Sequence, residues 1–240
     1  WKLGLIGRNG RGKTTLLRIL AGELMAKGEV SVPVAPALFP FPVADPERST
    51  RAVLRACAPA APDWRLEKEL EGLAVPPEAL VRPYHTLSRG EQTKAQLAAL
   101  FAREDSYPLI DEPTNHLDLA GRALVAAYLA RQDGFLLVSH DRDFLNRCVD
   151  HTLALNRATV AVQRGNFDDW EREWRRVNES EQARNEQLRK DVTRLTLSAR
   201  RQAEWSRRGE EGKFNVHPSE TAAVDRGYVG ARAAAVMKRS

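Results

Sequence analysis

The sequence predicts an α/β fold with a helical insertion and a long helical segment at its end. Short apolar runs of strand length, at residues 3–6, 107–110 and 134–139, alternate with segments that have helical spacing. Between residues 47 and 104 the pattern becomes mostly helical and charged. After residue 165 apolar side chains recur at threes and fours along a charged stretch, which predicts a long amphipathic helix.

Composition bounds the class of protein. The chain of 240 residues is 42% hydrophobic, enough for one large domain or a domain with an appendage. No apolar run approaches the roughly 20 residues that cross a bilayer, so we expect no membrane insertion. Cys57 and Cys148 lie outside any C-x-x-C spacing, which indicates a reduced, cytoplasmic setting. Trp1 is not an initiator methionine and does not begin a signal peptide, so we expect the chain to be part of a longer protein.

The first chemical motif is a glycine-rich turn between a predicted strand, residues 3–6, and a predicted helix that begins at KTTLL. The turn matches G-x-x-x-x-G-K-[ST]: its glycines let backbone N–H groups surround phosphates, Lys13 supplies charge, and Thr14 offers a hydroxyl to Mg²⁺. The predicted phosphate-binding residues are Gly7, Arg8, Asn9, Gly10, Arg11, Gly12, Lys13, Thr14 and Thr15. The alternative is an ordinary tight turn before a helix.

The next segments lead into the insertion. Residues 29–42 are expected to be extended, and their prolines argue against a regular central strand. Residues 47–104 are expected to form a helical subdomain inserted into the α/β core. Within it, Ser88 and Glu91 have the spacing of a capping box at a helix start. In the functional interpretation Ser88 and the Gly90 backbone contact a γ-phosphate, but this motif alone favours plain helix capping.

Two acidic residues follow the predicted strand at residues 107–110. We predict that Asp111 holds Mg²⁺ through its hydration shell and that Glu112 orients or deprotonates an attacking water. By itself, such a pair more often belongs to a loop that caps the next helix. The phosphate-binding motif upstream favours the catalytic interpretation, because phosphoryl transfer needs such a carboxylate. Pro108 removes a ladder donor, so we expect it at the beginning of the strand.

His140 follows the apolar run of residues 134–139. An imidazole there would hydrogen-bond a γ-phosphate or the attacking water, although a lone histidine at a strand end is usually structural. We expect a short helix after Asp141 and strands near HTLAL and TVAVQ.

Beyond Gly165 the sequence predicts a helical hairpin. A narrow apolar stripe consists of Phe167, Trp170, Trp174, Val177, Leu188, Val192 and Leu195. Such a stripe needs a partner helix. Residues 209–227 are expected to form a loop, and residues 227–240 the start of a returning helix that is cut off at Ser240.

Together and in this order, the four motifs resemble the nucleotide-binding domain of ATP-binding cassette (ABC) proteins over residues 1–165. The resemblance implies a P-loop NTPase core that hydrolyses ATP with Mg²⁺. The positions carried over are Lys13 and Thr14 for phosphate and Mg²⁺, Asp111 for the metal, Glu112 and His140 as catalytic residues, and residues 115–118 as the D-loop. Ser88 and Gly90 would face ATP bound to a second nucleotide-binding domain, so hydrolysis implies a pair of domains.

Within that family, four sequence segments resemble those of the F subfamily, ABC-F: LSRGEQTK, DEPTNHLD, VSHDRDFL and GNFDDWEREW. Its members are soluble and carry two such domains joined by a long helical linker. The resemblance implies a first domain at residues 1–165 and part of a coiled-coil linker at residues 166–240 that enters the ribosome, near rRNA and tRNA. FPFPV and DRGYVGARAAAVMKRS look most similar to members that protect ribosomes from antibiotics.

Three features depart from the family's pattern. Arg89 stands where the signature usually has glycine, and FPFPV lacks the glutamine expected near Mg²⁺. The aromatic residue that stacks on adenine would lie upstream of Trp1. Arg89 would alter the contact with the opposing ATP, and without the glutamine hydrolysis would rely on fewer ligands.

The predicted linker is basic. From Arg184 to Arg208 it carries eight basic residues against three acidic ones. This charge favours contacts with a phosphate backbone, while charge counting leaves a solvated coiled-coil face equally well supported. Phe214 and Tyr228 would stack on RNA bases or pack the tip of the hairpin.

The leading hypothesis is an ATP-driven protein that binds the ribosome and protects it from antibiotics or modulates translation. An alternative is the ATP-binding subunit of a membrane transporter, which shares all four motifs but does not need a charged hairpin after the core. A third is a nucleotide-binding regulator without hydrolysis, given Arg89 and the absent glutamine. A DNA-repair ATPase is less favoured, because such proteins carry their coiled coil between the first motif and the signature.

Overall fold

The computed structural model describes residues 1–8, 10–156 and 159–214, with side chains described as far as residue 208. The chain divides into a first compact unit, Trp1–Trp174, and a second unit that begins at Arg175. The division into a domain of residues 1–165 and a linker of residues 166–240 stays a prediction.

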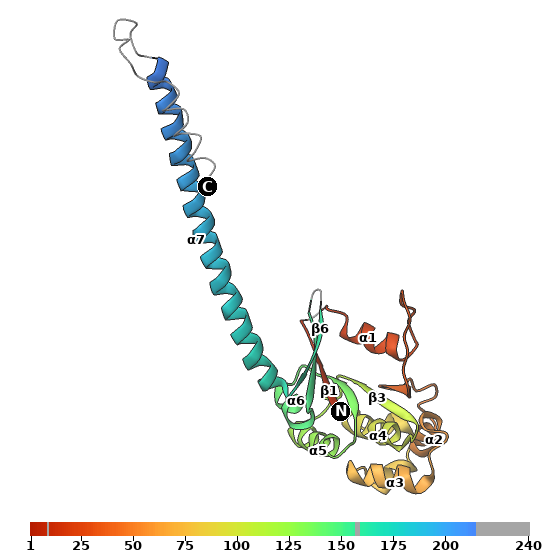
Figure 1. Cartoon of the computed structure of the whole chain (residues 1–240). Coiled ribbons are helices and arrows are strands. Elements are labelled where there is room, and N and C mark those ends of the chain that lie inside the picture. The colour runs from red at the N-terminus through yellow and green to blue at the C-terminus, as the bar shows by residue number, and fades with distance from the viewer. Residues whose placement is uncertain (9, 157–158, 215–240) are drawn as a thin grey trace, which may run out of the picture. The chain divides into compact units, whose positions relative to one another are not determined.

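A six-stranded sheet with the order β2-β3-β4-β1-β5-β6 forms the centre of the first unit (Figure 1). Its strands are β1 (Lys2–Ile6), β2 (Ala35–Phe39), β3 (Ser106–Asp111), β4 (Phe135–Val138), β5 (His151–Leu155) and β6 (Val160–Arg164). All neighbouring strands pair in parallel except β5 and β6, which are antiparallel. This sheet and its helices confirm the predicted α/β class.

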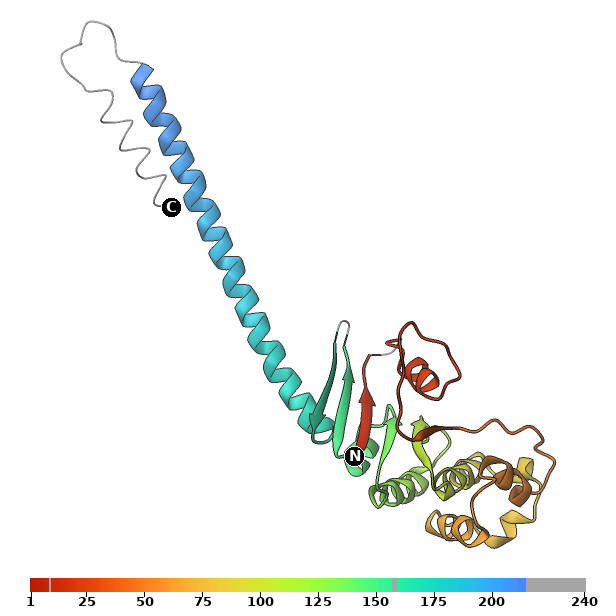
Figure 2. The same ribbon diagram turned by 45° about the vertical axis from the view of Figure 1, so that its right-hand side comes forward.

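The described helices either flank the sheet, form the insertion or, in the last case, continue from the first unit into the second. They are α1 (Lys13–Leu20), α2 (Thr50–Cys57), α3 (Asp63–Gly72), α4 (Arg89–Ala102), α5 (Leu119–Ala130), α6 (Arg142–Cys148) and α7 (Phe167–Phe214), with 3₁₀ turns η1 (Pro77–Leu80) and η2 (Tyr84–Thr86). Figure 2 shows α2 and α3 outward of α4, which lies next to the strands. Helices α2 to α4 lie within residues 47–104, where the sequence predicts the helical insertion.

Side-chain alternation in the strands gives the sheet two buried faces. Ile6 and Ile110 belong to the larger core, which includes buried residues of α4, α5 and α6. Their neighbours Leu5 and Leu109 point to the opposite face and pack with Leu17 of α1. Burial on both faces is what a parallel sheet between helices requires, and it fixes the register of the central strands.

Two prolines lie where only one side of a strand is paired. Pro36 lies in β2, an edge strand, in agreement with the prediction that residues 29–42 contain no central strand. Pro108 is the third residue of β3 rather than its first, so the predicted position was wrong. It is tolerated because β3 pairs with β4 only from Leu109 onward, and no β4 ladder bond is lost at Pro108.

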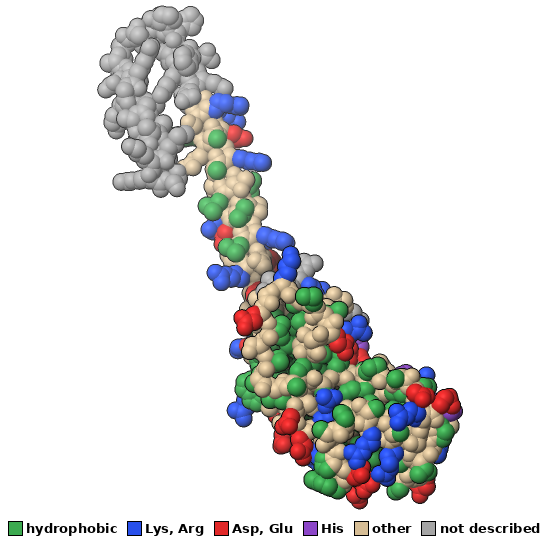
Figure 3. Space-filling view, turned by 90° about the vertical axis from the view of Figure 1, so that its right-hand side faces the viewer, with side chains coloured by type: hydrophobic (Ala, Val, Ile, Leu, Met, Phe, Trp, Pro, Cys, Tyr) green, Lys and Arg blue, Asp and Glu red, His purple; other side chains and the backbone are tan. Residues whose placement is uncertain are grey.

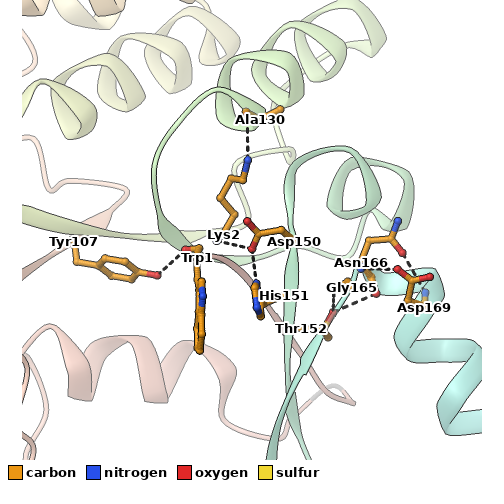
Figure 4. Close-up of polar contacts among 10 residues, drawn as sticks. All are labelled: Trp1, Lys2, Tyr107, Ala130, Asp150, His151, Thr152, Gly165, Asn166 and Asp169. Atoms are coloured by element: carbon orange, nitrogen blue, oxygen red, sulfur yellow. Dashed lines mark hydrogen bonds and ion pairs between the residues drawn. The ribbon is translucent and has the colours of Figure 1, made fainter.

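The start of α7 is tied to the sheet by a polar network (Figure 4). The hydroxyl of Thr152, in β5, donates to the carbonyl oxygens of Gly165 (3.0 Å) and Asn166 (3.3 Å). Asn166 and Asp169 cap the helix reciprocally, each side chain accepting the other's backbone N–H at 3.1 Å. Gly165 has a φ of 120°, and a Cβ there would lie 2.7 Å from the Asp169 carboxylate. The sequence GNFDD therefore specifies where the helix begins.

Helix α7 extends further than the sequence predicted. The loop expected from residue 209 does not begin there, since α7 continues to Phe214. A glycine inside a helix costs only about 1 kcal/mol, so Gly209 and Gly212 do not by themselves end it. The remainder of the predicted loop and the returning helix, residues 215–240, lie outside the described residues.

Two members of the predicted apolar stripe, Phe167 and Trp170, pack against the core, and the stripe is exposed from Trp174 onward. Val177, Leu188, Val192 and Leu195 all have large exposed surfaces, and Figure 3 shows hydrophobic side chains among Lys and Arg along this helix. Its pairing with a partner helix stays a prediction. Among the residues described, no helix combines the length and apolarity needed to cross a bilayer.

Replacing Thr152 by valine tests the anchoring of α7. Thr152 is 1% exposed, and the valine cannot donate to Gly165 or Asn166. We expect the free energy of unfolding to fall by about 1–3 kcal/mol in urea titrations. The control Thr193→Val removes an exposed hydroxyl of α7 and should change the free energy by less than about 0.5 kcal/mol. Equal effects of the two variants would contradict the anchoring role.

Candidate functional site

The glycine-rich turn joins the C-terminal end of β1 to α1. Gly10 and Gly12 have φ values of 76° and 83°, which favour glycine, and Gly12 precedes α1 without a side-chain cap. At Gly7 a Cβ would lie 3.1 Å from the carbonyl oxygen of Leu155, so glycine permits a close approach to β5. The first backbone N–H groups of α1 are therefore available to an anion.

Lys13 lies across this turn. Its side chain is buried, and Nζ donates to the carbonyl oxygen of Gly7 at 3.0 Å. Thr14 and Thr15 follow in the first turn of α1 and are exposed. The turn thus encloses the positively charged Lys13 ammonium, and the hydroxyls of Thr14 and Thr15 lie on its exposed side.

Asp111 and Glu112 come at the end of β3, beside the end of β4. The backbone N–H of Glu112 donates to the carbonyl oxygen of Val138 at 2.9 Å, and Glu112 has a φ of 50°. The backbone N–H of His140 donates to Glu112 Oε2 at 3.3 Å. The ring atom His140 Nε2 lies 3.3 Å from Glu112 Oε1, an ion-pair distance without hydrogen-bond geometry.

Burial raises the pKa of the Glu112 carboxyl above its usual value, and the neighbouring Asp111 carboxylate adds to the rise. The backbone N–H and the ring of His140 oppose the rise, as does the Lys13 ammonium. A carboxylate with a raised pKa is a better proton acceptor than an exposed one. Glu112 is therefore electrostatically suited to activate a water.

These elements surround one open cavity of about 380 Å³. Its lining residues are Gly10, Gly12, Lys13, Thr14, Thr15, Asp111, Glu112, Val138 and His140. Most of the predicted phosphate, metal and catalytic residues thus lie together, although they come from three separate loops. Asn9 lies outside the described residues. Arg8 and Arg11 line a different cavity, with His140 and the first turns of α7.

The donor atoms of this cavity fit a hard divalent cation. Within the described part of the chain, Asp111 Oδ1 and Glu112 Oε1 are buried without a hydrogen-bond partner. Buried carboxylate oxygens carry a high cost when unpaired, and Mg²⁺ prefers oxygen ligands of this kind. Asp111 and the Thr14 hydroxyl are the residues that would hold it.

Ser88 and Gly90 lie outside this cavity. Ser88 caps α4 in a full capping box: Glu91 N donates to Ser88 Oγ at 3.2 Å, and Ser88 N donates to Glu91 Oε2 at 2.7 Å. A Cβ at Gly90 would lie 3.2 Å from the carbonyl oxygen of His116. Glycine here lets the start of α4 pack on the loop after Glu112. A phosphate contact by Ser88 and Gly90 stays a prediction.

Sequence reasoning missed two polar residues that position the loops. Arg122, in α5, donates from Nη1 to Asp141 Oδ2 (3.0 Å) and from Nε to the carbonyl oxygen of Leu117 (3.2 Å). It thereby connects the loop after Glu112 to the loop of His140. Nothing in its sequence neighbourhood distinguishes it from a solvated helical arginine.

The second is Gln96 of α4, 7% exposed. Its Oε1 accepts from Phe41 N at 2.9 Å, and its Nε2 donates to Phe41 O at 3.3 Å. The FPFPV segment, which lacks the expected glutamine, is therefore held by a glutamine from another element.

Stability should depend on pH through Glu112. Because the folded-state pKa of Glu112 is raised, its contribution is complete below the unfolded value near 4.5 and is lost as pH rises through the folded value. Glu112→Gln should therefore unfold at higher denaturant than the wild type at pH 8, and the gain should shrink toward pH 4.5.

The matched control is Glu91→Gln in the capping box. Hydrogen bonds from Ser88 hold the pKa of the Glu91 carboxyl below its usual value, so this variant should be less stable than the wild type above pH 4.5. Denaturant titrations at four pH values separate the two cases. A loss of stability in Glu112→Gln at pH 8 would contradict the burial argument.

Comparisons with known proteins identify the family. A family model described as "ABC transporter" matches residues 1–115. The chain is 31% identical over 178 residues to "ABC transporter F family member 3" of Arabidopsis thaliana, covering 71% of this chain and 25% of the relative. It is 32% identical over 206 residues to "Ribosome protection protein VmlR" of Bacillus subtilis (strain 168), covering 85% and 35%.

Among solved structures, the complex of the archaeal ribosomal stalk protein aP1 with the archaeal ribosome recycling factor aABCE1 has a TM-score of 0.54 and 25% identity. That match covers 64% of this chain and 31% of the other. The chain spans 25% to 35% of the length of these two curated relatives. By its motifs, its fold and these relatives, the chain belongs to the ATP-binding cassette family, in its ABC-F branch.

Proposed function

We propose that this chain is the ATP-binding and ATP-hydrolysing domain of a cytoplasmic ABC-F protein that acts on the ribosome. The observation that carries the proposal is the convergence of Lys13, Asp111 and Glu112 on one cavity, with His140 at its side. Nucleotide phosphates need a cation, backbone donors, a metal ligand and a base. Here the glycine-rich turn and the start of α1 supply the first two, and the end of β3 supplies the last two.

The residues divide the work between binding and proton transfer. The backbone N–H groups at the start of α1 hold the phosphates, and the Lys13 ammonium gains a charged acceptor in place of the Gly7 carbonyl. Mg²⁺, when bound, would neutralise phosphate charge, held by Asp111 and Thr14. Glu112 accepts the proton of the attacking water, while His140 keeps that carboxylate in position.

A second nucleotide-binding domain completes the site in this proposal. The cavity is open, and Ser88 and Gly90 do not line it. Their helix start, capped within its own chain, is instead free to approach a phosphate bound elsewhere. On this basis the isolated chain binds ATP weakly and barely hydrolyses it.

The charge of α7 supports a ribosomal partner. Residues 175–208 contain ten Lys and Arg against five Asp and Glu. A basic surface of this kind suits the phosphate backbone of rRNA or tRNA. Two relatives point the same way, since one is named a ribosome protection protein and the other is a ribosome recycling factor in complex with a ribosomal stalk protein. Protection from antibiotics and modulation of translation are the two roles that we propose.

Nucleotide binding by the chain tests the first part of the proposal. Lys13→Ala should weaken binding of a fluorescent ATP analogue with Mg²⁺ at least about tenfold, because the turn loses its inner charge. Glu112→Gln should bind like the wild type, as should the exposed control Glu78→Gln. Wild-type affinity in Lys13→Ala would reject the proposed site.

Ribosome co-sedimentation tests the second part in the full-length gene product. The Glu112→Gln variant binds ATP but lacks the base that activates water, so it should stay in the ATP-bound state. It should therefore pellet with ribosomes at least several-fold more in ATP than in ADP. The pelleted fraction should fall as salt rises, because phosphate contacts release counterions. Absence of any ATP-dependent increase would reject the ribosomal role, and copurification with a membrane permease would favour the transporter alternative.

A further inference from the structure

A second cavity, of about 520 Å³, lies beside the phosphate site and within the first compact unit. Lys13 and His140 line both cavities. The remaining walls of the second include Arg8 and Arg11 from the glycine-rich turn and the first two turns of α7. The nucleotide loops therefore face the start of α7 across a space that side chains do not fill.

One arginine crosses this boundary. Arg142, two residues after His140, begins α6. Its Nη1 lies 3.0 Å from Glu171 Oε1 in α7, and its guanidinium lies 5.0 Å from the centre of the Phe167 ring. One side chain thus makes both an ion pair and a cation–π contact with the first turns of α7.

Other contacts hold the first turns of α7 to elements outside the His140 loop. The backbone N–H of Asp168 donates to Asn146 Oδ1 at 3.0 Å, and Phe167 and Trp170 pack against the main core. Thr152 binds the residues before the helix. These contacts set where α7 begins, whereas Arg142 links it to the loop that contacts Glu112.

We propose that Arg142 is a positioning residue that passes the state of the nucleotide site from His140 to the first turns of α7. This inference rests on the proposed function, because it needs nucleotide at His140. When phosphate engages the His140 loop, the backbone of residues 140–142 shifts. The guanidinium moves with it and carries Glu171 and Phe167. The proposed movement concerns these first turns of α7, which belong to the first compact unit, ending at Trp174.

The exposure of the pair sets the size of the effect. The side chain of Arg142 is 63% exposed and that of Glu171 is 23% exposed. Partly exposed ion pairs are worth only about a 2- to 5-fold change in an equilibrium, and salt screens them. Arg142 therefore adjusts the position of the first turns of α7, and the other contacts hold the helix in place.

Trp170 and Trp174 provide a direct readout. Their rings stack with centroids 6.0 Å apart, and both residues line the second cavity. Nucleotide binding that moves the first turns of α7 should change their fluorescence. The double variant Trp170→Phe with Trp174→Phe shows how much of the emission change of the chain comes from this pair.

The experiment titrates the full chain with Mg²⁺ and ATP and follows tryptophan emission, while a fluorescent ATP analogue measures affinity separately. We expect Arg142→Met to keep nucleotide affinity within about 2-fold and to lose at least half of the emission change. Exchanging the charges, as Arg142→Glu with Glu171→Arg, should restore most of the change. Arg147→Met, an exposed arginine of the same helix, is the control and should behave like the wild type.

The outcomes are separable. If the wild type binds nucleotide but its emission does not change, or if Arg142→Met responds fully, the inference is overturned. If the wild type binds no nucleotide, the proposed function fails and the inference falls with it. If the thermal midpoint of Arg142→Met is lowered, unfolding could account for a lost emission change. In that case, a restored emission change in the charge-exchanged variant supports the inference, and an emission change that stays lost overturns it.

Discussion

The parallel pairing of β1, β3 and β4 is the constraint on which the site depends. Gly4 and Ile110 both pair with Leu137 of β4, so the three strands end at the same edge of the sheet. The turn after β1 delivers Lys13, the end of β3 delivers the acidic pair, and the end of β4 delivers His140. Because the central strands are packed on both faces, a slip of the register would disrupt both cores. The arrangement of the proposed site residues at the edge of the sheet is therefore a consequence of side-chain packing in the core.

Glu112 shows how backbone geometry and electrostatics combine at this edge. Its φ of 50° is uncommon for a residue other than glycine, and such conformations persist only where the surroundings enforce them. Here the hydrogen bond from its N–H to Val138 O ties the residue to the neighbouring strand. The same placement buries the carboxyl, which raises its pKa. A single backbone arrangement thus sets both the position and the basicity of the proposed base.

The sheet also connects the nucleotide turn to the start of α7. Gly4 of β1 pairs with Thr152 of β5, and Thr152 holds the two residues that precede the helix. A strand pair therefore lies between the phosphate turn and the start of the helix, while the Arg142–Glu171 ion pair joins the helix to α6 from the His140 side. In our proposal, the first contact anchors the helix and the second lets a ligand bias its first turns.

The sequence by itself determined the features whose partners are close along the chain. The glycine-rich turn and the Ser88 capping box each depend on residues that are close along the chain, within about one or two helical turns. Their patterns can therefore be recognised in the sequence. Gln96 and Arg122 were not predicted, because their partners Phe41 and Asp141 lie 55 and 19 positions away. The position of Pro108 was likewise decided by where β4 begins to pair. Only the tertiary structure brings such partners together, since distant contacts depend on the register of the sheet and leave no local pattern.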